Sequence, residues 1–460
     1  MNGTVHIVGG GLAGSEAAWQ VLQRGCRVVL HEMRPKTMTA AHQTGSLAEL
    51  VCSNSLKSMG ADTAPGLLKA EMAAFDSVIL RSAFEAKVPA GQALAVDREI
   101  FSASISKALH SHPDFLRLDE EVFELPSEAE MESRGEVWII ATGPLTSSSM
   151  AQAIEQLCPP TSRRLYFYDA IAPVIAADSI DMNHAFRASR YDKDDGVGDG
   201  DYLNLPLNRE EYDAFIEAVR TAEYMPLHAF EETKYFEACL PIEVMVERGP
   251  QTLRFGPMKP VGLTDPRTGR RPWANLQLRQ ENVEGTMFSM VGFQTKMKWP
   301  EQKRVFSMIP ALREAEFLRF GSVHRNTYVK SPEALSQDLS FKSNSRVFLA
   351  GQVTGVEGYT ESAAIGLLAG QAAVAKMKGQ IFAMPPKTTM IGALGHYVTF
   401  GSLGEFQPMN ANLGLLPPEA RLRGETKGDR KSRQCAAARR AFGEYLSAAV
   451  AENNLVDSGV

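Results

Sequence analysis

The stretch TVHIVGGGLAGSEAAWQVLQRGCRVVLHE, residues 4–32, decides the fold. A short apolar strand over residues 5–8 leads into a glycine turn, an alanine-rich helix over residues 16–24 and a second strand over residues 27–31. This order of strand, turn, helix and strand is typical of a dinucleotide-binding βαβ unit. We therefore expect the chain to begin with a Rossmann-like unit.

The glycines of this turn have the spacing GxGxxG, at Gly9, Gly11 and Gly14. In such a turn the first glycine permits the tight bend, the second lets the backbone approach a pyrophosphate, and the third lets helix and strand pack closely. The pyrophosphate would lie at the helix N-terminus, where free N–H groups favour anions. Glu32 ends the second strand, where an acid accepts hydrogen bonds from ribose hydroxyls.

Two later segments favour FAD as the dinucleotide. The segment EVWIIATGPLT (136–146) is an apolar strand that ends in a glycine loop, and residues 346–373 predict a strand, a glycine loop and a helix of small residues. We expect this late helix to direct its N-terminus at the flavin ring, where its dipole would favour an anionic reduced flavin. The cofactor-binding residues that we expect are Gly9, Gly10, Gly11, Leu12, Ala13, Gly14, Glu32, Gly143, Gly351, Gln352, Tyr359 and Glu361.

The FAD segments lie at the two ends of the chain, so we expect a discontinuous FAD-binding domain made of residues 1–160 and 330–460. Residues 161–329 would then form an inserted domain on the substrate or RNA side. Proline and glycine are frequent there, which favours short strands and loops, with a helix over residues 209–222. The predicted fold class is α/β: a Rossmann-like FAD-binding domain with a smaller, mixed α/β insertion. A second GxGxxG after a strand is absent from the sequence, so NADPH or NADH would act as a diffusible reductant.

Composition excludes several classes of protein. The chain has 460 residues, of which 44% are hydrophobic and 22% charged, and no run of eighteen apolar residues that would predict a membrane span. The first residues lack the features of a secretory signal. Five cysteines without a CxxC pair argue against a zinc site or a disulfide framework, so we expect no metal and a reducing cytoplasm.

Basic residues gather in three clusters although the net charge is −6. Residues 265–273 include Trp273, residues 296–304 include Trp299, and residues 421–440 hold eight basic and two acidic side chains. Each cluster alone is compatible with a solvated surface. Together they suggest phosphate contacts with base stacking. The RNA-binding candidates are Arg267, Arg270, Arg271, Lys296, Lys298, Arg430 and Lys431.

One cysteine has an unusual setting. Cys52 lies in ELVCSNSLKS (49–58), a polar run rather than an apolar one, and Lys57 follows it closely. A nearby positive charge favours the thiolate form of a cysteine. Cys239 has apolar neighbours, so the residues alone favour a structural role. We interpret Cys26, Cys158 and Cys435 as structural or incidental.

A series of segments, in one order from end to end, carries a family resemblance: VGGGLAGSEAAWQ, HEMRP, ELVCSNSLKS, GLLKAEM, VPAGQALAVDR, KYFEACLPIEVMVERG, TLRFGPMKPVGL, VGFQTKMKWPEQKRVF, AGQVTGVEGYTESAA and FQPMNANLGLLPP. The chain resembles the folate- and FAD-dependent tRNA uridine-5-methyltransferases, the TrmFO family, which are distantly similar to the larger GidA flavoproteins. The family usually has glycine where Ala238 precedes the second cysteine.

The resemblance implies methylation of uracil C5 at position 54 of the tRNA T-loop, with 5,10-methylenetetrahydrofolate as the carbon donor and reduced FAD as the source of electrons. It also implies that Cys52 and Cys239 are catalytic. A thiolate that adds to C6 makes C5 nucleophilic, and a second group must move a proton. We expect Cys239 to be the nucleophile and Cys52 the base or proton shuttle, with the reverse assignment also open. A related enzyme modifies ribosomal RNA, so rRNA is a second possible substrate.

Other residues have less specific interpretations. Tyr359 and Glu361 would stack on folate, orient it or cap the late helix. Asp97 and Arg98 would pair with each other or line the flavin site, and His324 fits a core histidine. Two other functions remain open: a flavoprotein oxidoreductase acting on a small molecule, and a FAD-stabilised RNA-binding protein without methyl transfer. The sequence leaves the oligomeric state undetermined.

Overall fold

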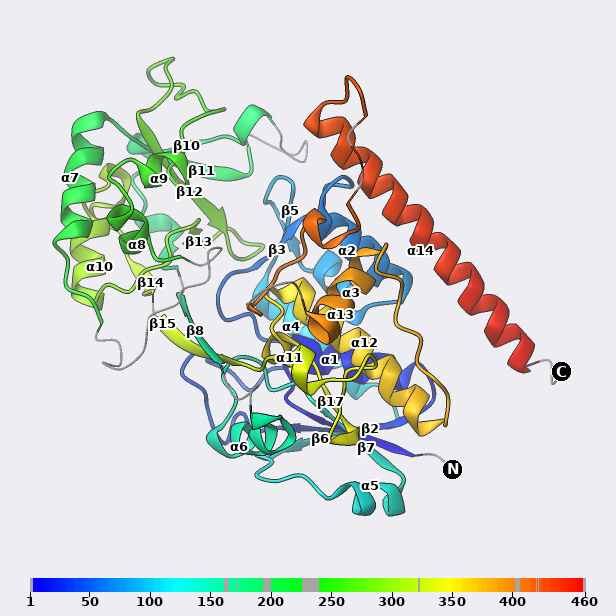
Figure 1. Cartoon of the computed structure of the whole chain (residues 1–460). Coiled ribbons are helices and arrows are strands. Elements are labelled where there is room, and N and C mark those ends of the chain that lie inside the picture. Colours follow the sequence, from blue (N-terminus) through cyan, green and yellow to red (C-terminus); the bar gives the residue numbers. More distant parts are fainter. Residues whose placement is uncertain are drawn as a thin grey trace.

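The structure is a computed structural model, shown in Figure 1. It describes residues 3–160, 165–170, 172–192, 200–225, 240–321, 323–401, 406–418, 420 and 422–457. Two separate hydrophobic cores organise these residues. The first core draws on residues 5–158 and 328–442, and the second on residues 175–315. We call the elements around them the first unit and the inserted unit.

The first unit is built on a six-stranded sheet whose strand order is β16-β17-β7-β1-β2-β6. All neighbours pair in parallel except the edge strand β16. The strands are β1 (Thr4–Val8), β2 (Arg27–Glu32), β6 (Phe115–Asp119), β7 (Glu136–Ile140), β16 (Ser340–Phe341) and β17 (Asn344–Leu349). β2 follows β1 on one side of that strand, and β7 pairs with β1 on the other side. This reversal of strand order creates a crevice at the carboxyl ends of β1 and β7. The predicted α/β class is confirmed.

Two helices pack on this sheet with very close contact. They are α1 (Leu12–Leu22) and α12 (Tyr359–Met377). A Cβ atom at Gly366 would lie 2.2 Å from the carbonyl oxygen of Ala13, so only glycine fits there. The first helix begins at Leu12, four residues before the predicted start, because Gly11 is its N-cap.

Further helices and a small sheet complete the first unit. The small sheet consists of β3 (Ser55–Ser58), β4 (Lys87–Val88) and β5 (Ala93–Val96). The helices are α2 (Ala64–Ala74), α3 (Val78–Glu85), α4 (Arg98–His110), α5 (Glu128–Arg134), α6 (Ser148–Leu157), α11 (Ser331–Ala334), α13 (Met390–Phe400) and α14 (Lys427–Asp457). Figure 1 shows α14 in red, running along one side of the molecule and past its body. None of the helices in the described ranges is both long and apolar enough to span a membrane.

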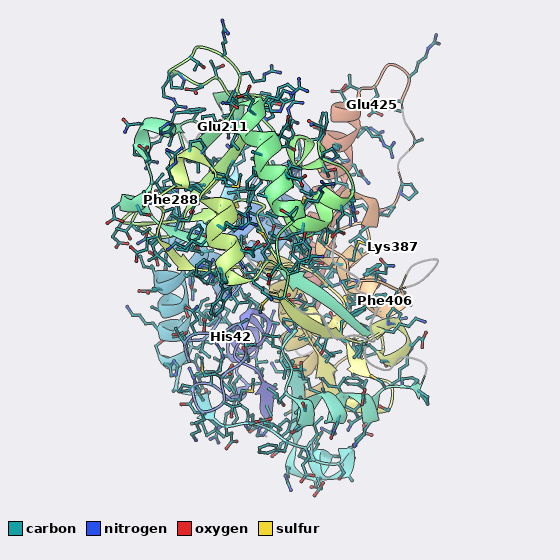
Figure 2. The ribbon with its side chains drawn as sticks, turned by 90° about the vertical axis from the view of Figure 1, so that its left-hand side faces the viewer. His42, Glu211, Phe288, Lys387, Phe406 and Glu425 are labelled. Carbon is teal, nitrogen blue, oxygen red and sulfur yellow. The ribbon has the colours of Figure 1, made fainter. Side chains whose placement is uncertain are left out.

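The inserted unit holds a six-stranded antiparallel sheet in the order β10-β11-β12-β13-β9-β14. Its strands are β9 (Val174–Ala176), β10 (Phe186–Arg187), β11 (Tyr202–Leu207), β12 (Ala274–Gln280), β13 (Met287–Met290) and β14 (Phe317–Arg319). Its helices are α7 (Arg209–Arg220), α8 (Ile242–Glu247), α9 (Thr252–Phe255) and α10 (Trp299–Phe306). The predicted helix and the short strands are therefore present. Figure 2 shows this unit, which carries Glu211 and Phe288, above the part of the first unit that carries His42.

A two-stranded ribbon joins the units. It consists of β8 (Leu165–Ala170) and β15 (Val323–Tyr328), paired antiparallel. Figure 1 shows the ribbon between the inserted unit and the parallel sheet. Thr327 donates a backbone hydrogen bond to the Pro144 carbonyl at 3.0 Å, which ties the ribbon to the first unit. The chain thus leaves and re-enters the first unit along two adjacent strands.

Candidate functional site

A cavity lies at the crevice of the parallel sheet, between the glycine turn and the start of α12. Eight of the predicted cofactor residues line it: Gly9, Gly11, Leu12, Ala13, Glu32, Gly143, Gln352 and Tyr359. The wall also contains residues that we did not predict, among them His31, Arg34, His42, Glu49, Val51, Thr142 and Ser362. Most of these lie in loops, whereas His31 belongs to β2 and Ser362 to α12. Their approach to the cavity depends on tertiary packing, so the local sequence gave no signal for them.

The glycine turn forms an open cradle at the N-terminus of α1. Gly9 has a φ of +104°, a conformation that L side chains rarely adopt. A Cβ at Gly14 would lie 1.9 Å from the Gly9 carbonyl oxygen, whereas a Cβ at Gly11 would meet no atom within 4 Å. The N-cap is Gly11, which has no side chain to bind the first N–H groups of α1. This geometry suits a pyrophosphate.

Glu32 is fixed at the cavity wall as a carboxylate. It accepts a hydrogen bond from the Gly10 N–H at 2.8 Å, and Arg34 binds it through Nε at 2.9 Å and Nη2 at 3.0 Å. Burial alone would raise the pKa of Glu32, but the hydrogen bonds and charge of Arg34 outweigh it and lower that pKa. Arg34 also bridges to Glu49 at 3.0 Å.

Four predicted cofactor residues lie behind the wall instead of on it. Gly10 holds Glu32, and Gly14 and Gly351 permit close packing, the latter because its Cβ would lie 2.7 Å from that of Ala13. Glu361 is fully buried. These residues support the lining residues from behind and do not themselves contact the cavity.

Tyr359 connects the cavity to Cys52. Its hydroxyl oxygen accepts hydrogen bonds from the Cys52 N–H at 2.7 Å and from the Ser53 N–H at 3.1 Å. Burial raises the pKa of Tyr359 far above its ordinary value, so the phenol stays neutral. Cys52 is half-buried and forms no disulfide. The predicted thiol therefore lies beside the start of the predicted flavin helix.

Lys57 does not have the role that we expected. Its Nζ lies 2.6 Å from Glu361 Oε1, a carboxylate that also accepts a hydrogen bond from the Ala411 N–H at 3.0 Å. The charge of Lys57 is thus paired with Glu361, in the first turn of α12. A second cation, the guanidinium of Arg319, binds the Cys52 backbone, with Nη2 3.4 Å from its carbonyl oxygen.

Asp97 and Arg98 do not pair with each other. Asp97 caps α4 by accepting hydrogen bonds from the Glu99 and Ile100 N–H groups. Arg98 instead binds Glu281 of the inserted unit, with 2.8 Å between Nε and Oε2. The pairing is tertiary because residue 98 begins a helix and its side chain points across the boundary between the units.

The remaining cysteines divide clearly. Cys26, Cys158 and Cys435 are buried, and burial raises the pKa of each, that of Cys158 to about 12. This burial is consistent with the structural or incidental role that we predicted, because a buried neutral thiol is inert. Cys239 and the side chain of His324 lie outside the described residues. In the ranges that the structure describes, no three His, Cys, Asp or Glu side chains form a metal site.

Comparisons with known proteins identify the family. Residues 4–381 match the family model described as glucose inhibited division protein A. A protein of Geobacter sulfurreducens is 52% identical over 96% of this chain and 98% of its own length, and its name is methylenetetrahydrofolate–tRNA-(uracil-5-)-methyltransferase TrmFO. A relative of the same name from Aquifex aeolicus is 50% identical over 100% of this chain and 99% of its own length.

The chain belongs to the TrmFO family. A structure of Aquifex aeolicus GidA has a TM-score of 0.68 and 14% identity, covering 96% of this chain and 73% of the GidA chain. That likeness supports the Rossmann-like fold of this TrmFO member. The cavity, the glycine cradle and Cys52 all lie within the part that matches the family model.

Three of the RNA-binding candidates of this TrmFO member are engaged by acids of their own chain. Arg267 lies 2.7 Å from Asp265, Lys298 2.8 Å from Glu223, and Lys296 3.7 Å from Glu247. Such pairs reduce the charge that is available to a phosphate. The other four candidates are exposed: Arg270, Arg271, Arg430 and Lys431.

The two tryptophans beside the basic clusters also differ. The Trp273 ring is covered by Arg254, whose guanidinium carbon lies 3.8 Å from the ring centroid, and Arg209 lies 5.4 Å away. Trp299 is 58% exposed and stacks on Phe320. Trp299 alone of the two has the exposed face that base stacking requires.

Proposed function

We propose that this chain methylates C5 of the uridine at position 54 of the tRNA T-loop, using 5,10-methylenetetrahydrofolate and FAD. Relatives that are 50–54% identical to this chain are named methylenetetrahydrofolate–tRNA-(uracil-5-)-methyltransferases, and their similarity identifies the chain as such an enzyme. One observation supports the mechanism most directly: Tyr359 holds the backbone of Cys52 at the edge of the cavity.

The residues around the cavity fit FAD. The cradle at Gly11 and the N-terminus of α1 would hold its pyrophosphate, and Glu32 would meet the adenosine ribose. The start of α12, with Tyr359, would face the flavin ring. When bound and reduced, FAD supplies the electrons that convert a one-carbon unit into a methyl group.

The thiols of this chain carry the steps on uracil. The thiolate of Cys239 adds to C6, and the electron pair of the C5–C6 bond moves towards O4, so that C5 becomes nucleophilic. C5 then bonds to the methylene carbon of the folate donor. Cys52 removes the C5 proton, the bond from this carbon to the folate nitrogen breaks, and tetrahydrofolate leaves an exocyclic methylene on C5. The hydride that makes this methylene a methyl group would be the contribution of reduced FAD, and the Cys239 thiolate leaves C6 as the C5–C6 double bond is restored. The reverse assignment of the two thiols balances equally well.

The remaining partners follow from this chemistry. NADPH or NADH would arrive as a diffusible reductant. We place the enzyme in the cytoplasm, where a tRNA substrate is available and thiols stay reduced. The inserted unit and α14 would face the RNA through Arg270, Arg271, Arg430 and Lys431, and the exposed ring of Trp299 would be available for base stacking.

The test is methyl transfer in a defined system. Undermethylated tRNA is incubated with the purified protein, 5,10-methylenetetrahydrofolate and NADPH, and 5-methyluridine is measured by nucleoside mass spectrometry. We expect product with the wild-type protein and none with Cys52→Ser or Cys239→Ser, while both variants retain FAD absorbance. Cys158→Ala is the matched control and should stay active, because its thiol is buried away from the cavity. Product on rRNA fragments but not on tRNA would refute the tRNA assignment, and an active double variant would refute the thiol mechanism.

A further inference from the structure

The segment that carries Cys52 is held by side chains instead of by a sheet. Residues 49–54 precede β3 and belong to no helix or strand. Backbone groups of such a segment still need hydrogen-bond partners when they are buried. For residues 50–53 the partners are polar side chains from distant parts of the chain, whereas the Asn54 carbonyl accepts a backbone hydrogen bond from Val96 at 2.9 Å. The position of the Cys52 thiol therefore depends on those side chains.

Arg319 binds this segment from the inserted unit. Its Nη1 donates to the Val51 carbonyl at 3.1 Å and its Nη2 to the Cys52 carbonyl at 3.4 Å. Arg319 ends β14, which pairs with β9 at the edge of the inserted sheet. The planar guanidinium spans two successive carbonyls, which a lysine ammonium cannot do with the same geometry.

A second anchor from the inserted unit lies on the other side of Cys52. Asn54 donates through Nδ2 to the Gln280 carbonyl at 2.9 Å and to the Val96 carbonyl at 3.0 Å. Arg279 donates through Nε to Asn54 Oδ1 at 2.8 Å. The end of β12 and the end of β14 thus bracket Cys52, while Tyr359 holds it from the first unit.

The anchors form one buried ionic network. Glu281 is 3% exposed and pairs with Arg98, which also donates to the Leu50 carbonyl. Burial would raise the pKa of Glu281, but the charges of Arg98 and Arg279 outweigh it and lower that pKa. Charges in such a network keep a defined geometry because loss of one partner leaves another buried and unpaired.

We propose that Arg319 is a positioning residue, which holds the Cys52 segment in its reactive place only while the inserted unit is docked on the first unit. The proposal rests on the proposed role of Cys52 in the reaction. Arg319 donates hydrogen bonds to the two backbone carbonyls at Val51 and Cys52, so it acts through the loop. The unit proposed to meet the RNA would in this way also set the position of a thiol beside the cavity.

Amide hydrogen exchange tests the positioning without any catalysis. In Arg319→Met we expect exchange at the Cys52 and Ser53 amides to rise by about tenfold or more, with β1 and α12 unchanged. Arg313→Met is the matched control, because Arg313 is an exposed arginine of the same unit. Unchanged exchange at these two amides would overturn the proposal, and so would an equal rise throughout the protein. If Arg319→Met does not fold, Arg319→Lys replaces it, with the same expectation.

Kinetics separate positioning from binding. We expect kcat of Arg319→Met to fall by about 10–100-fold, with the KM values for tRNA and folate and the FAD content unchanged. Arg319→Lys should not restore kcat, because an ammonium lacks the rigid planar fork that fixes the two carbonyls relative to each other. An unchanged kcat, or a higher KM for tRNA at unchanged kcat, would overturn the proposal. If the wild-type protein formed no 5-methyluridine, the proposed function would fail, yet the exchange experiment would still decide what Arg319 does to the loop.

Discussion

At the scale of single residues, two histidines form an unusual pair on the parallel sheet. His6 Nδ1 lies 3.0 Å from His31 Nε2, and both rings stack on Trp138, that of His6 at 4.4 Å between centroids. His31 Nδ1 also lies 2.9 Å from Glu120 Oε1, and His31 and Glu120 both line the cavity. Burial lowers the pKa of His6 to about 4, helped by the neighbouring His31, although Glu136 lies 3.7 Å away.

This pair predicts a loss of stability in acid. The folded protein keeps His6 neutral down to about pH 4, whereas the unfolded chain binds a proton near pH 6.5, so stability falls as the pH drops through that window. The shift corresponds to at most about 3 kcal/mol. We expect His6→Gln to lose less stability than wild type between pH 7 and pH 5, measured by urea unfolding. His110→Gln, at an exposed histidine, should follow the wild-type curve, and equal slopes for His6→Gln and wild type would contradict this reading.

The sequence predicted those site residues whose identity is determined by local backbone geometry alone. Gly9 and Gly14 were predictable because a tight turn and a close approach leave room for no other residue. The partners of Lys57 and Arg98 were not, because each pairs with an acid far along the chain. Arg319 gave no signal for the same reason: its contacts exist only after the two units dock.

At the scale of elements, the packing of α1 on α12 predicts a severe effect of one methyl group. In Gly366→Ala the new Cβ would lie 2.2 Å from the Ala13 carbonyl oxygen, so the helices must separate. We expect a loss of about 2–4 kcal/mol in the free energy of unfolding. FAD content, measured by absorbance, should also fall because Ala13 lines the cavity.

The control for this change is another helical glycine. Gly443 lies in α14, and a Cβ there would meet no atom within 4 Å. Gly443→Ala should raise stability by about 0.5–1 kcal/mol, because alanine is the better helix former. If both variants unfolded alike, helix propensity and not the close contact would explain the result.

Element types were more predictable than element limits. The apolar runs correctly predicted the strands β1, β2, β7 and β17, and the pattern of small residues correctly predicted the helix α12. The start of α1 was placed too late, because we did not treat Gly11 as the N-cap. The small sheet of β3, β4 and β5 had no clear pattern, since its strands are short.

At the scale of the whole molecule, the exposed basic residues predict how tRNA binding responds to salt. Arg270→Gln and Arg271→Gln should each weaken binding and lower the slope of log Kd against log salt by about 0.9 per lost phosphate contact. Arg267→Gln should change the slope less, because Asp265 already engages that side chain. Arg313→Gln controls for net charge, and filter binding at several salt concentrations gives the slopes. An equal slope change in all four variants would show a general charge effect and no specific contact.

The order of the strands in the parallel sheet has a consequence for biosynthesis. The ribosome releases β1, β2, β6 and β7 first, but β7 acquires its second neighbour only when β17 emerges, and the cavity gains its far wall only with α12. The whole inserted unit is translated in between. A nascent chain therefore exposes the glycine turn long before it can enclose a nucleotide, and the cavity can close around a cofactor only after α12 has been made.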